Sequence, residues 1–263
     1  MSRRLALITG ASAGIGAAFA QVYAGHGYDL ALTARREDRL EEVADQVRLR
    51  HGVEVLVVPA DLADPGAPAT ILGQIADHGR EVDALINNAG FGIQGDYGAS
   101  TWAEQDRFLR VLLLTVCEMT HRVLPGMRER RFGRIVNVAS LAGLVPGAPS
   151  TGLYGATKAF LVRFSQSLHL EVRADGVHVS ALCPGFTHSE FAAVNKTQAM
   201  TDKVPTWMWL GADEVAAAGY EAGEANRPIC VPGAPNKALA ALGKLLPDDW
   251  SMAILAQSSG RSK

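Results

Sequence analysis

Short apolar runs alternate along this chain with longer stretches that carry helical periodicity. Runs that are apolar throughout predict buried strands, and their alternation with helices predicts a parallel sheet covered on both faces. The predicted strands are 5–9, 29–34, 53–60, 82–90, 134–140, 177–185 and 228–233. The predicted helices are 14–25, 37–50, roughly 66–77, 101–130 and 152–174. No linker interrupts the alternation, so we expect an α/β doubly wound parallel sheet of about seven strands, in a single domain over residues 1–263.

Composition narrows the classes of partner and compartment. The net charge of −2, with no dominant basic face, gives no reason to expect a nucleic-acid partner. The three cysteines form no C-x-x-C pair and the seven histidines do not cluster, so we expect no metal site. The first residues lack the apolar core of a signal peptide, and no apolar stretch is long enough to span a bilayer. These features predict a cytoplasmic protein with no membrane partner.

Three glycines follow the first predicted strand, in the stretch TGASAGIG. Gly10, Gly14 and Gly16 stand at a strand-to-helix turn, where glycine allows the backbone to approach a pyrophosphate and the helix N-terminus favours its charge. Their spacing is G-x-x-x-G-x-G rather than the common G-x-G-x-x-G. A simple tight turn is the alternative, but the flanking strand and helix favour a nucleotide site.

The residues after the second predicted strand indicate which dinucleotide binds. A fold of this kind that binds NAD carries an acid about 20 residues after the glycines, where it holds the ribose 2′-hydroxyl. Ala34 stands there, and Arg35 and Arg36 follow. Guanidinium groups match a 2′-phosphate, so the sequence predicts NADP rather than NAD. The alternative is a pair of exposed arginines at the start of a helix.

Six motifs in order resemble the short-chain dehydrogenase/reductase family. The resemblance covers residues 5 to about 235 and implies a Rossmann-like fold that transfers hydride between NADP(H) and a carbonyl or alcohol. The motifs are Thr9-Gly10-x-x-x-Gly14-x-Gly16, Asp61-Leu62, Asn87-Asn88-Ala89-Gly90, Ser140, Tyr154-x-x-x-Lys158 and Pro184-Gly185. Each motif alone is weak, whereas six in the family's order are specific.

The resemblance also implies a role for each motif in holding the cofactor. Asp61 would accept a hydrogen bond from the adenine amino group, although it could instead cap the next helix. Asn87 would brace neighbouring strands, and Pro184 and Gly185 would form the floor under the nicotinamide. The implied cofactor-binding residues are Gly10, Ser12, Gly14, Ile15, Gly16, Arg35, Arg36, Asp61, Leu62, Asn88, Ala89, Gly90, Tyr154, Lys158, Pro184, Gly185 and Thr187.

With these motifs present, the pentapeptide YGATK, residues 154–158, is interpreted as part of a catalytic site. Residues four apart share one face of a helix, so Tyr154 and Lys158 can act together. A nearby ammonium group and an oxidised nicotinamide favour the phenolate, which lets tyrosine exchange a proton with a carbonyl oxygen. Lys158 would also hold the nicotinamide ribose, and Ser140 the substrate oxygen. The alternative for the pair alone is an ordinary helix surface.

Two features depart from the family pattern. Similar members place an asparagine in the long central helix, where it helps to hold a water that links the lysine to solvent, and Leu112 stands at that position here. Proton resupply is therefore in question. In addition, Ser140 precedes Tyr154 by 14 residues, one more than is usual in the family, which leaves Ser150 and Thr151 as rival hydroxyls.

The segment after the sixth predicted strand, about 186–210, is the expected substrate lid. Its apolar side chains predict a bulky, apolar substrate, or else they pack on the domain or on a partner subunit. They are Phe191, Met200, Trp207, Met208 and Trp209, with Ile93, Leu144 and Val145 as further candidates. His188 reads as a surface residue, and the tail from about 236 as an interface helix.

Apolar positions on more than one face of the helices at 101–130 and 152–174 predict self-association. Phe160, Phe164 and Leu168 are examples, and the resemblance implies a homodimer or homotetramer. The expected function is an NADP(H)-dependent oxidoreductase that interconverts a ketone or aldehyde with an alcohol. The alternative is a non-enzymatic NADP-binding sensor or scaffold, which only Leu112 favours. A lyase or dehalogenase without nicotinamide requires a disabled glycine loop, and this loop is intact.

Overall fold

Seven parallel strands form one sheet in the order β3-β2-β1-β4-β5-β6-β7. The computed structural model describes residues 3–93, 95–147, 151–189, 204–247, 249, 250 and 252. The chain runs outward from β1 to β3, then returns to β4 on the other side of β1, which makes the β1–β4 boundary the switch point. The strands are β1 Leu5–Thr9, β2 Asp29–Thr33, β3 Val55–Val57, β4 Ala84–Asn87, β5 Gly133–Val138, β6 Val177–Leu182 and β7 Ile229–Cys230.

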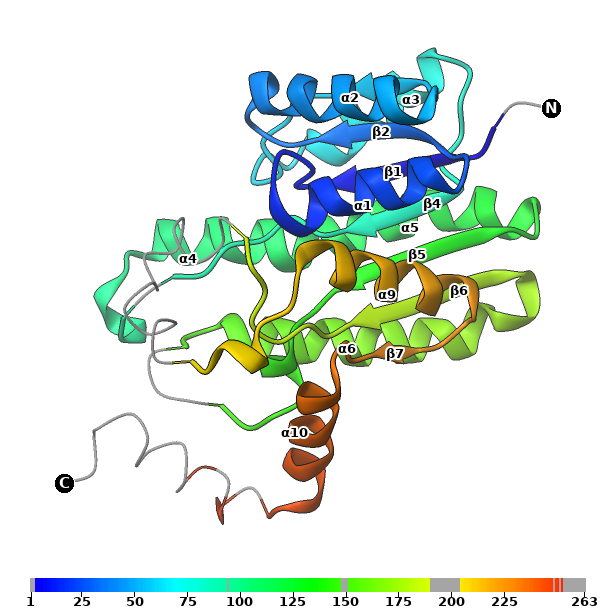
Figure 1. The fold of residues 1–263 in the computed structure, drawn as a ribbon. Helices are drawn as coiled ribbons and strands as arrows, with labels where there is room; N and C mark the ends of the chain where they lie inside the picture. The colour runs from blue at the N-terminus through cyan, green and yellow to red at the C-terminus, as the bar shows by residue number, and fades with distance from the viewer. Residues whose placement is uncertain are drawn as a thin grey trace.

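Helices cover both faces of this sheet, as Figure 1 shows. The helices α1, α2 and α9 pack on one face, and α3, α4, α5 and α6 on the other, each layer with its own apolar core. This arrangement confirms the predicted doubly wound, Rossmann-like fold. The helices are α1 Gly14–Gly25, α2 Glu37–His51, α3 Ala67–Asp77, α4 Trp102–Leu109, α5 Thr115–Glu129, α6 Tyr154–Val172, α9 Ala212–Glu224 and α10 Ala234–Leu245.

The predicted helix at 101–130 needs a correction. It begins with a capping box, in which Thr101 and Glu104 exchange hydrogen bonds with each other's backbone, and it runs to Glu129. Between α4 and α5, however, a π-helical segment, η2, spans Arg110–Leu114. Such segments insert a residue into the helix and are common near functional sites. Leu112 lies in the middle of η2, so the helix is irregular at the position where the sequence departs from its family.

Helix α9 was not predicted, and the predicted strands other than 5–9 are longer than the observed ones. The face of α9 that packs on α1 is made mostly of small residues, and its two buried glycines, Gly219 and Gly223, lower the helix propensity of the segment. A Cβ on Gly219 would lie 2.7 Å from the ring of Phe19, so glycine is what allows this close packing. The run 53–60 contains only the short β3, because apolar residues continue past the strand ends.

Polar side chains inside the sheet brace neighbouring strands near their carboxyl ends. Asn87 on β4 donates through Nδ2 to Oδ1 of Asn137 on β5 at 2.8 Å and to the hydroxyl of Thr120 at 3.3 Å. Asn137 in turn donates to Ser165 on α6 at 2.9 Å. Buried amides are stable when they are paired in this way. Asn87 therefore has the bracing role that the resemblance implied.

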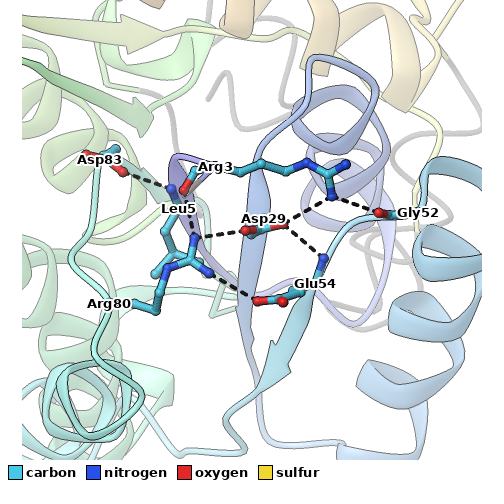
Figure 2. A network of polar contacts seen from close by, with 7 residues as sticks. All are labelled: Arg3, Leu5, Asp29, Gly52, Glu54, Arg80 and Asp83. Carbon is cyan, nitrogen blue, oxygen red and sulfur yellow. Dashed lines mark hydrogen bonds and ion pairs between the residues drawn. The ribbon is translucent and has the colours of Figure 1, made fainter. Parts of the chain in front are cut away.

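A second polar network lies near the amino ends of β1 and β2 (Figure 2). The buried carboxylate of Asp29 pairs with the guanidinium of Arg80 at 2.9 Å and accepts the backbone N–H of Glu54 at 3.0 Å. Arg80 also donates to the carbonyl of Arg3 at 2.8 Å. Asp83 accepts the N–H of Leu5 at 2.9 Å. These contacts tie the amino ends of four neighbouring strands, β3, β2, β1 and β4, together at the edge opposite the glycine loop.

Candidate active site

The glycine loop lies between β1 and α1 at the carboxyl edge of the sheet. Gly10 and Gly14 have φ of +65° and +55°, which side chains rarely adopt, and a Cβ on Gly16 would collide with the carbonyl of Gly10. Helix α1 starts at Gly14 after Ala13, whose side chain cannot cap the first N–H groups. With no acidic residue in that first turn, the helix N-terminus is suited to an anion such as a pyrophosphate.

Asn88 shapes this loop from the neighbouring strand. Its Nδ2 donates to the carbonyl of Thr9 at 2.9 Å and to that of Gly10 at 3.2 Å. The hydroxyl of Thr9 accepts the N–H groups of Asn88 and Ala89 at 2.9 and 3.0 Å. The Asn88 side chain is thus committed to the protein, and the backbone of the Asn88–Gly90 segment is what the expected ribose contact would use.

Two exposed arginines stand beside the loop, where β2 ends. Arg36 donates from Nη2 to the hydroxyl of Ser12 at 3.2 Å, which brings its cation to the glycine loop. Arg35 precedes it, and Ala34 leaves no carboxylate at the end of β2. A group with two further negative charges, such as a ribose 2′-phosphate, fits a site of this composition.

Asp61 follows β3 and is held by a residue that the sequence analysis did not single out. Nη2 of Arg107 on α4 lies 3.0 Å from Oδ1 and 2.7 Å from Oδ2 of Asp61, and the N–H of Ala63 lies 3.0 Å from Oδ1. Partial burial acts to raise the pKa of Asp61, but these hydrogen bonds and the charges of Arg107 and Arg35 hold that pKa below its usual value.

The helix-capping alternative for Asp61 does not hold, because α3 begins at Ala67 and Gly66 is its N-cap residue. Leu62 follows Asp61 and is buried against the layer that contains α3 and α5. No motif could have revealed Arg107, since 46 residues separate it from its partner.

Tyr154, Ser140 and Lys158 come together at the carboxyl end of β5. Tyr154 is the first residue of α6, and its hydroxyl is hydrogen-bonded to Ser140, which follows β5. Lys158 lies one turn later, buried, with Nζ donating to the carbonyl of Val138 at 2.7 Å and lying 5.7 Å from the centre of the Tyr154 ring. Of the rival hydroxyls, Thr151 lies just before Tyr154, and Ser150 lies outside the described residues.

Burial has the largest effect on the pKa values of Tyr154 and Lys158. It raises the pKa of Tyr154, against a smaller lowering by the hydrogen bond with Ser140. It also lowers the pKa of Lys158 to about 8, against a smaller opposing effect of Cys183. The expectation from the sequence was that the ammonium group and an oxidised nicotinamide together favour the phenolate. In the protein without its cofactor, burial has the larger effect and raises the pKa of Tyr154.

Leu112 lies deep in the same region. Its exposed fraction is 1%, and its Cγ lies 3.7 Å from the point where a Cβ on Gly90 would be. Nζ of Lys158 lies 3.8 Å from that same point. An apolar side chain therefore stands near the lysine where the family pattern has an amide, which is consistent with the lowered pKa of Lys158.

The segment after β6 contains Pro184 and Gly185, which the resemblance places under the nicotinamide. The carbonyl of Pro184 accepts the N–H of Leu141 at 2.9 Å, which joins this segment to the loop that carries Ser140. A Cβ on Gly185 would collide with the buried side chain of Asn236 on α10. The hydroxyl of Thr187 donates to the carbonyl of Gly185 at 3.2 Å, so its position is fixed by the protein itself.

The described part of the segment expected to form the substrate lid carries aromatic side chains. Trp209 stacks on the exposed ring of His188 with centroids 4.8 Å apart and lies 5.7 Å from Phe186, while Trp207 is 65% exposed. Phe191 and Met200 lie outside the described residues. Val145 packs beside α10, where a Cβ on Gly243 would lie 3.1 Å from Val145 Cγ1.

Ile93, another candidate, borders a cavity beside Tyr154. The cavity has a volume of about 10 Å³, which is room for about one water molecule. Gln105 and Thr151 also line it.

Comparison with known proteins agrees with this geometry. A family model described as short chain dehydrogenase matches residues 4–199. Very-long-chain 3-oxoacyl-CoA reductase from Homo sapiens is 34% identical over 195 residues, which cover 73% of this chain but only 62% of that protein. The structure of a short-chain dehydrogenase from Sphingobium yanoikuyae in complex with NADPH superposes with a TM-score of 0.80 at 30% identity, over 93% of this chain and 96% of that chain.

A second solved structure is similar over nearly the whole chain. It is the bulky-bulky ketone specific alcohol dehydrogenase from Comamonas testosteroni, with a TM-score of 0.76 and 27% identity over 94% of this chain and 96% of that chain. The NADP expected from the sequence agrees with the NADPH of the Sphingobium structure. The matched region contains the glycine loop, the residues around Asp61 and the Ser140–Tyr154–Lys158 group. This chain therefore belongs to the short-chain dehydrogenase family.

Proposed function

We propose that this protein is an NADP(H)-dependent oxidoreductase that interconverts a ketone or aldehyde with an alcohol. The observation that carries the proposal is the meeting of Tyr154, Ser140 and Lys158 at the carboxyl end of β5, beside the glycine loop and Asn88. Bound NADPH supplies the hydride for reduction. The residues of the chain bind the cofactor, orient the carbonyl and supply the proton, so that carbonyl, hydride and proton together give the alcohol.

Each residue of the group has a separate task in this mechanism. Ser140 hydrogen-bonds the substrate oxygen and fixes it near the tyrosine hydroxyl. Tyr154 donates its proton to that oxygen, and a phenol whose pKa is raised by burial is poised to hold the proton until the oxygen becomes basic. Lys158 hydrogen-bonds the nicotinamide ribose and, when charged, stabilises the phenolate that remains.

NADP is the proposed cofactor because Ser12, Arg35 and Arg36 form a cationic site beside the glycine loop. The proposed substrate is bulky and apolar, since the described part of the lid exposes Trp207 and stacks Trp209 on His188. Residues 1–263 would form a single domain, with the lid at about 186–210 and a C-terminal tail from about 236. Within the part of the chain that the structure describes, no helix is long and apolar enough to cross a membrane. A cytoplasmic location remains a proposal.

The test is a panel of ketones and aldehydes of increasing size, with NADPH or NADH, followed by the loss of nicotinamide absorbance. We expect turnover with NADPH, rising toward bulky apolar ketones. Equal use of NADH would contradict the proposed cofactor. Tight NADPH binding without turnover of any carbonyl would instead support the second candidate, a non-enzymatic NADP-binding sensor, which the burial of Leu112 near Lys158 favours.

A further inference from the structure

The Asp61–Arg107 pair differs in geometry from an ordinary surface ion pair. One nitrogen of Arg107 lies within hydrogen-bonding distance of both carboxylate oxygens, at 3.0 and 2.7 Å, and the N–H of Ala63 fixes Oδ1 from a third direction. Both side chains are 40% exposed, so the distinction lies in the hydrogen bonds and not in burial. The pair joins α4 to the turn after β3, two segments that are otherwise separate in sequence. Asp61 is therefore fixed in both position and charge.

The charge of Asp61 conflicts with the cofactor proposed above. A ribose 2′-phosphate adds two negative charges near Arg35, and Arg35 is itself close enough to Asp61 to lower the pKa of its carboxyl. An uncompensated Asp61 carboxylate near Arg35 would repel the ribose 2′-phosphate. It would also compete with that phosphate for the Arg35 guanidinium. NADH lacks the 2′-phosphate, so the same carboxylate would weaken NADH binding little.

We propose that Arg107 determines cofactor specificity by neutralising Asp61, so that Asp61 does not compete with the 2′-phosphate for Arg35. This inference rests on the proposed NADP(H) function. Arg107 acts through Asp61 and is a positioning residue rather than a catalytic one. Its effect is selective: the pair keeps Asp61 in place for the adenine amino group of either cofactor, while its neutral net charge matters only to the cofactor that carries the phosphate.

The experiment compares the dissociation constants of NADPH and NADH by fluorescence titration in the full-length protein. Arg107→Gln removes the charge but keeps an amide donor for Asp61, and Arg107→Ala removes both. Asp61→Asn removes the carboxylate charge but keeps an acceptor for adenine. Arg122→Ala is the matched control, because Arg122 forms a comparable ion pair with Glu118 at 2.8 Å on the same helical run, away from the glycine loop.

We expect Arg107→Gln to weaken NADPH binding by about tenfold and NADH binding by less than about twofold, as one unneutralised charge near a partly exposed phosphate implies. The double change Arg107→Gln with Asp61→Asn should recover most of the NADPH affinity. Added salt should shrink the difference between the two cofactors. The control should change neither constant.

Equal weakening of both cofactors, or no recovery in the double variant, would overturn the inference, because either result assigns Arg107 a structural role only. The proposed function fails differently, since the unmodified protein would then bind NADH as tightly as NADPH or bind neither. Circular dichroism of each variant identifies a folding defect, and the Arg107→Gln and Arg107→Ala variants must then agree in the direction of the NADPH-to-NADH ratio.

Discussion

At the scale of single residues, the site depends on polar groups that are buried before any ligand binds. Lys158 has one strong partner, the carbonyl of Val138, and an apolar neighbour in Leu112. Tyr154 has Ser140. Both groups are buried, so their charged forms are costly. Function thus comes at a cost in the stability of the protein without its cofactor.

The lysine gives a prediction with a definite sign. Its pKa is about 8 in the folded protein and 10.5 in the reference state, so folding disfavours the charged form. The unfolded chain binds more protons between these values, and the Lys158 contribution to stability therefore rises with pH from about 8 to 10.5. Below that window the cost is about 3 kcal/mol.

We therefore expect Lys158→Met to stabilise the cofactor-free protein by roughly 1–3 kcal/mol near neutral pH, with the gain shrinking as the pH approaches 10. Urea unfolding of both proteins across this pH range measures it. Lys237→Met is the control, because Lys237 is exposed, and it should change stability little at any pH. A gain from Lys158→Met that is independent of pH would contradict the assignment.

At the scale of elements, the two ends of the sheet have separate tasks. The carboxyl end holds the glycine loop, Asn88 and the Ser140–Tyr154–Lys158 group, whereas the amino end is tied by Asp29 and Arg80. Buried ion pairs of this kind are costly to break because one charge is left unpaired. The Asp29–Arg80 pair therefore supports the fold without touching the site.

Arg80→Ala should lower the free energy of unfolding by about 2–4 kcal/mol, because the buried Asp29 carboxylate loses its ion pair at 2.9 Å and, among the described residues, keeps the longer one with Arg3 at 3.8 Å. NADPH affinity should not change. Arg122→Ala, which breaks an exposed pair, should cost at most about 0.5 kcal/mol. Urea unfolding and cofactor titration of both variants provide the measurements. An equal loss of unfolding free energy in Arg80→Ala and Arg122→Ala would show that the Asp29–Arg80 pair stabilises the fold no more than an exposed ion pair does.

The sequence predicted elements and motifs more reliably than contacts between distant segments. Apolar runs located all seven strands because burial on both faces leaves a continuous apolar stretch in the sequence. Most predicted strands extended beyond the observed strand ends, as the run 53–60 around β3 shows. Helix α9 was not predicted, and its buried face consists mostly of small residues. The Tyr154–Lys158 pair was predictable because both residues lie on one helix. Arg107 was not, because only the folded chain brings it to Asp61.

At the scale of the whole molecule, α6 carries apolar surface that the described chain leaves uncovered. Phe160 is 39% exposed and stacks on Phe164 with centroids 5.8 Å apart. Leu168, which was expected to lie on the same exposed surface, is instead buried in the core. An aromatic pair of this kind favours contact with a second copy of the chain, as the proposed homodimer or homotetramer requires.

We predict that the protein has at least twice the chain mass in solution at micromolar concentration, and that Phe160→Glu shifts it toward the monomer by placing a charge in the contact. Static light scattering measures both states, and Leu49→Glu, at an exposed leucine of α2, is the control. A monomeric unmodified protein, or the same association in Phe160→Glu, would refute a dimer through α6.

The most direct test of the account is the reduction of a good ketone by Tyr154→Phe, with NADPH binding measured on the same sample. The change removes only the hydroxyl that meets Ser140, and the ring still packs at the start of α6. We predict a loss of turnover of about 10²–10⁴ with NADPH affinity nearly unchanged, as expected when a general acid is removed. Tyr220→Phe, on α9, should keep full turnover. A Tyr154→Phe protein that retains most of its turnover would contradict the account.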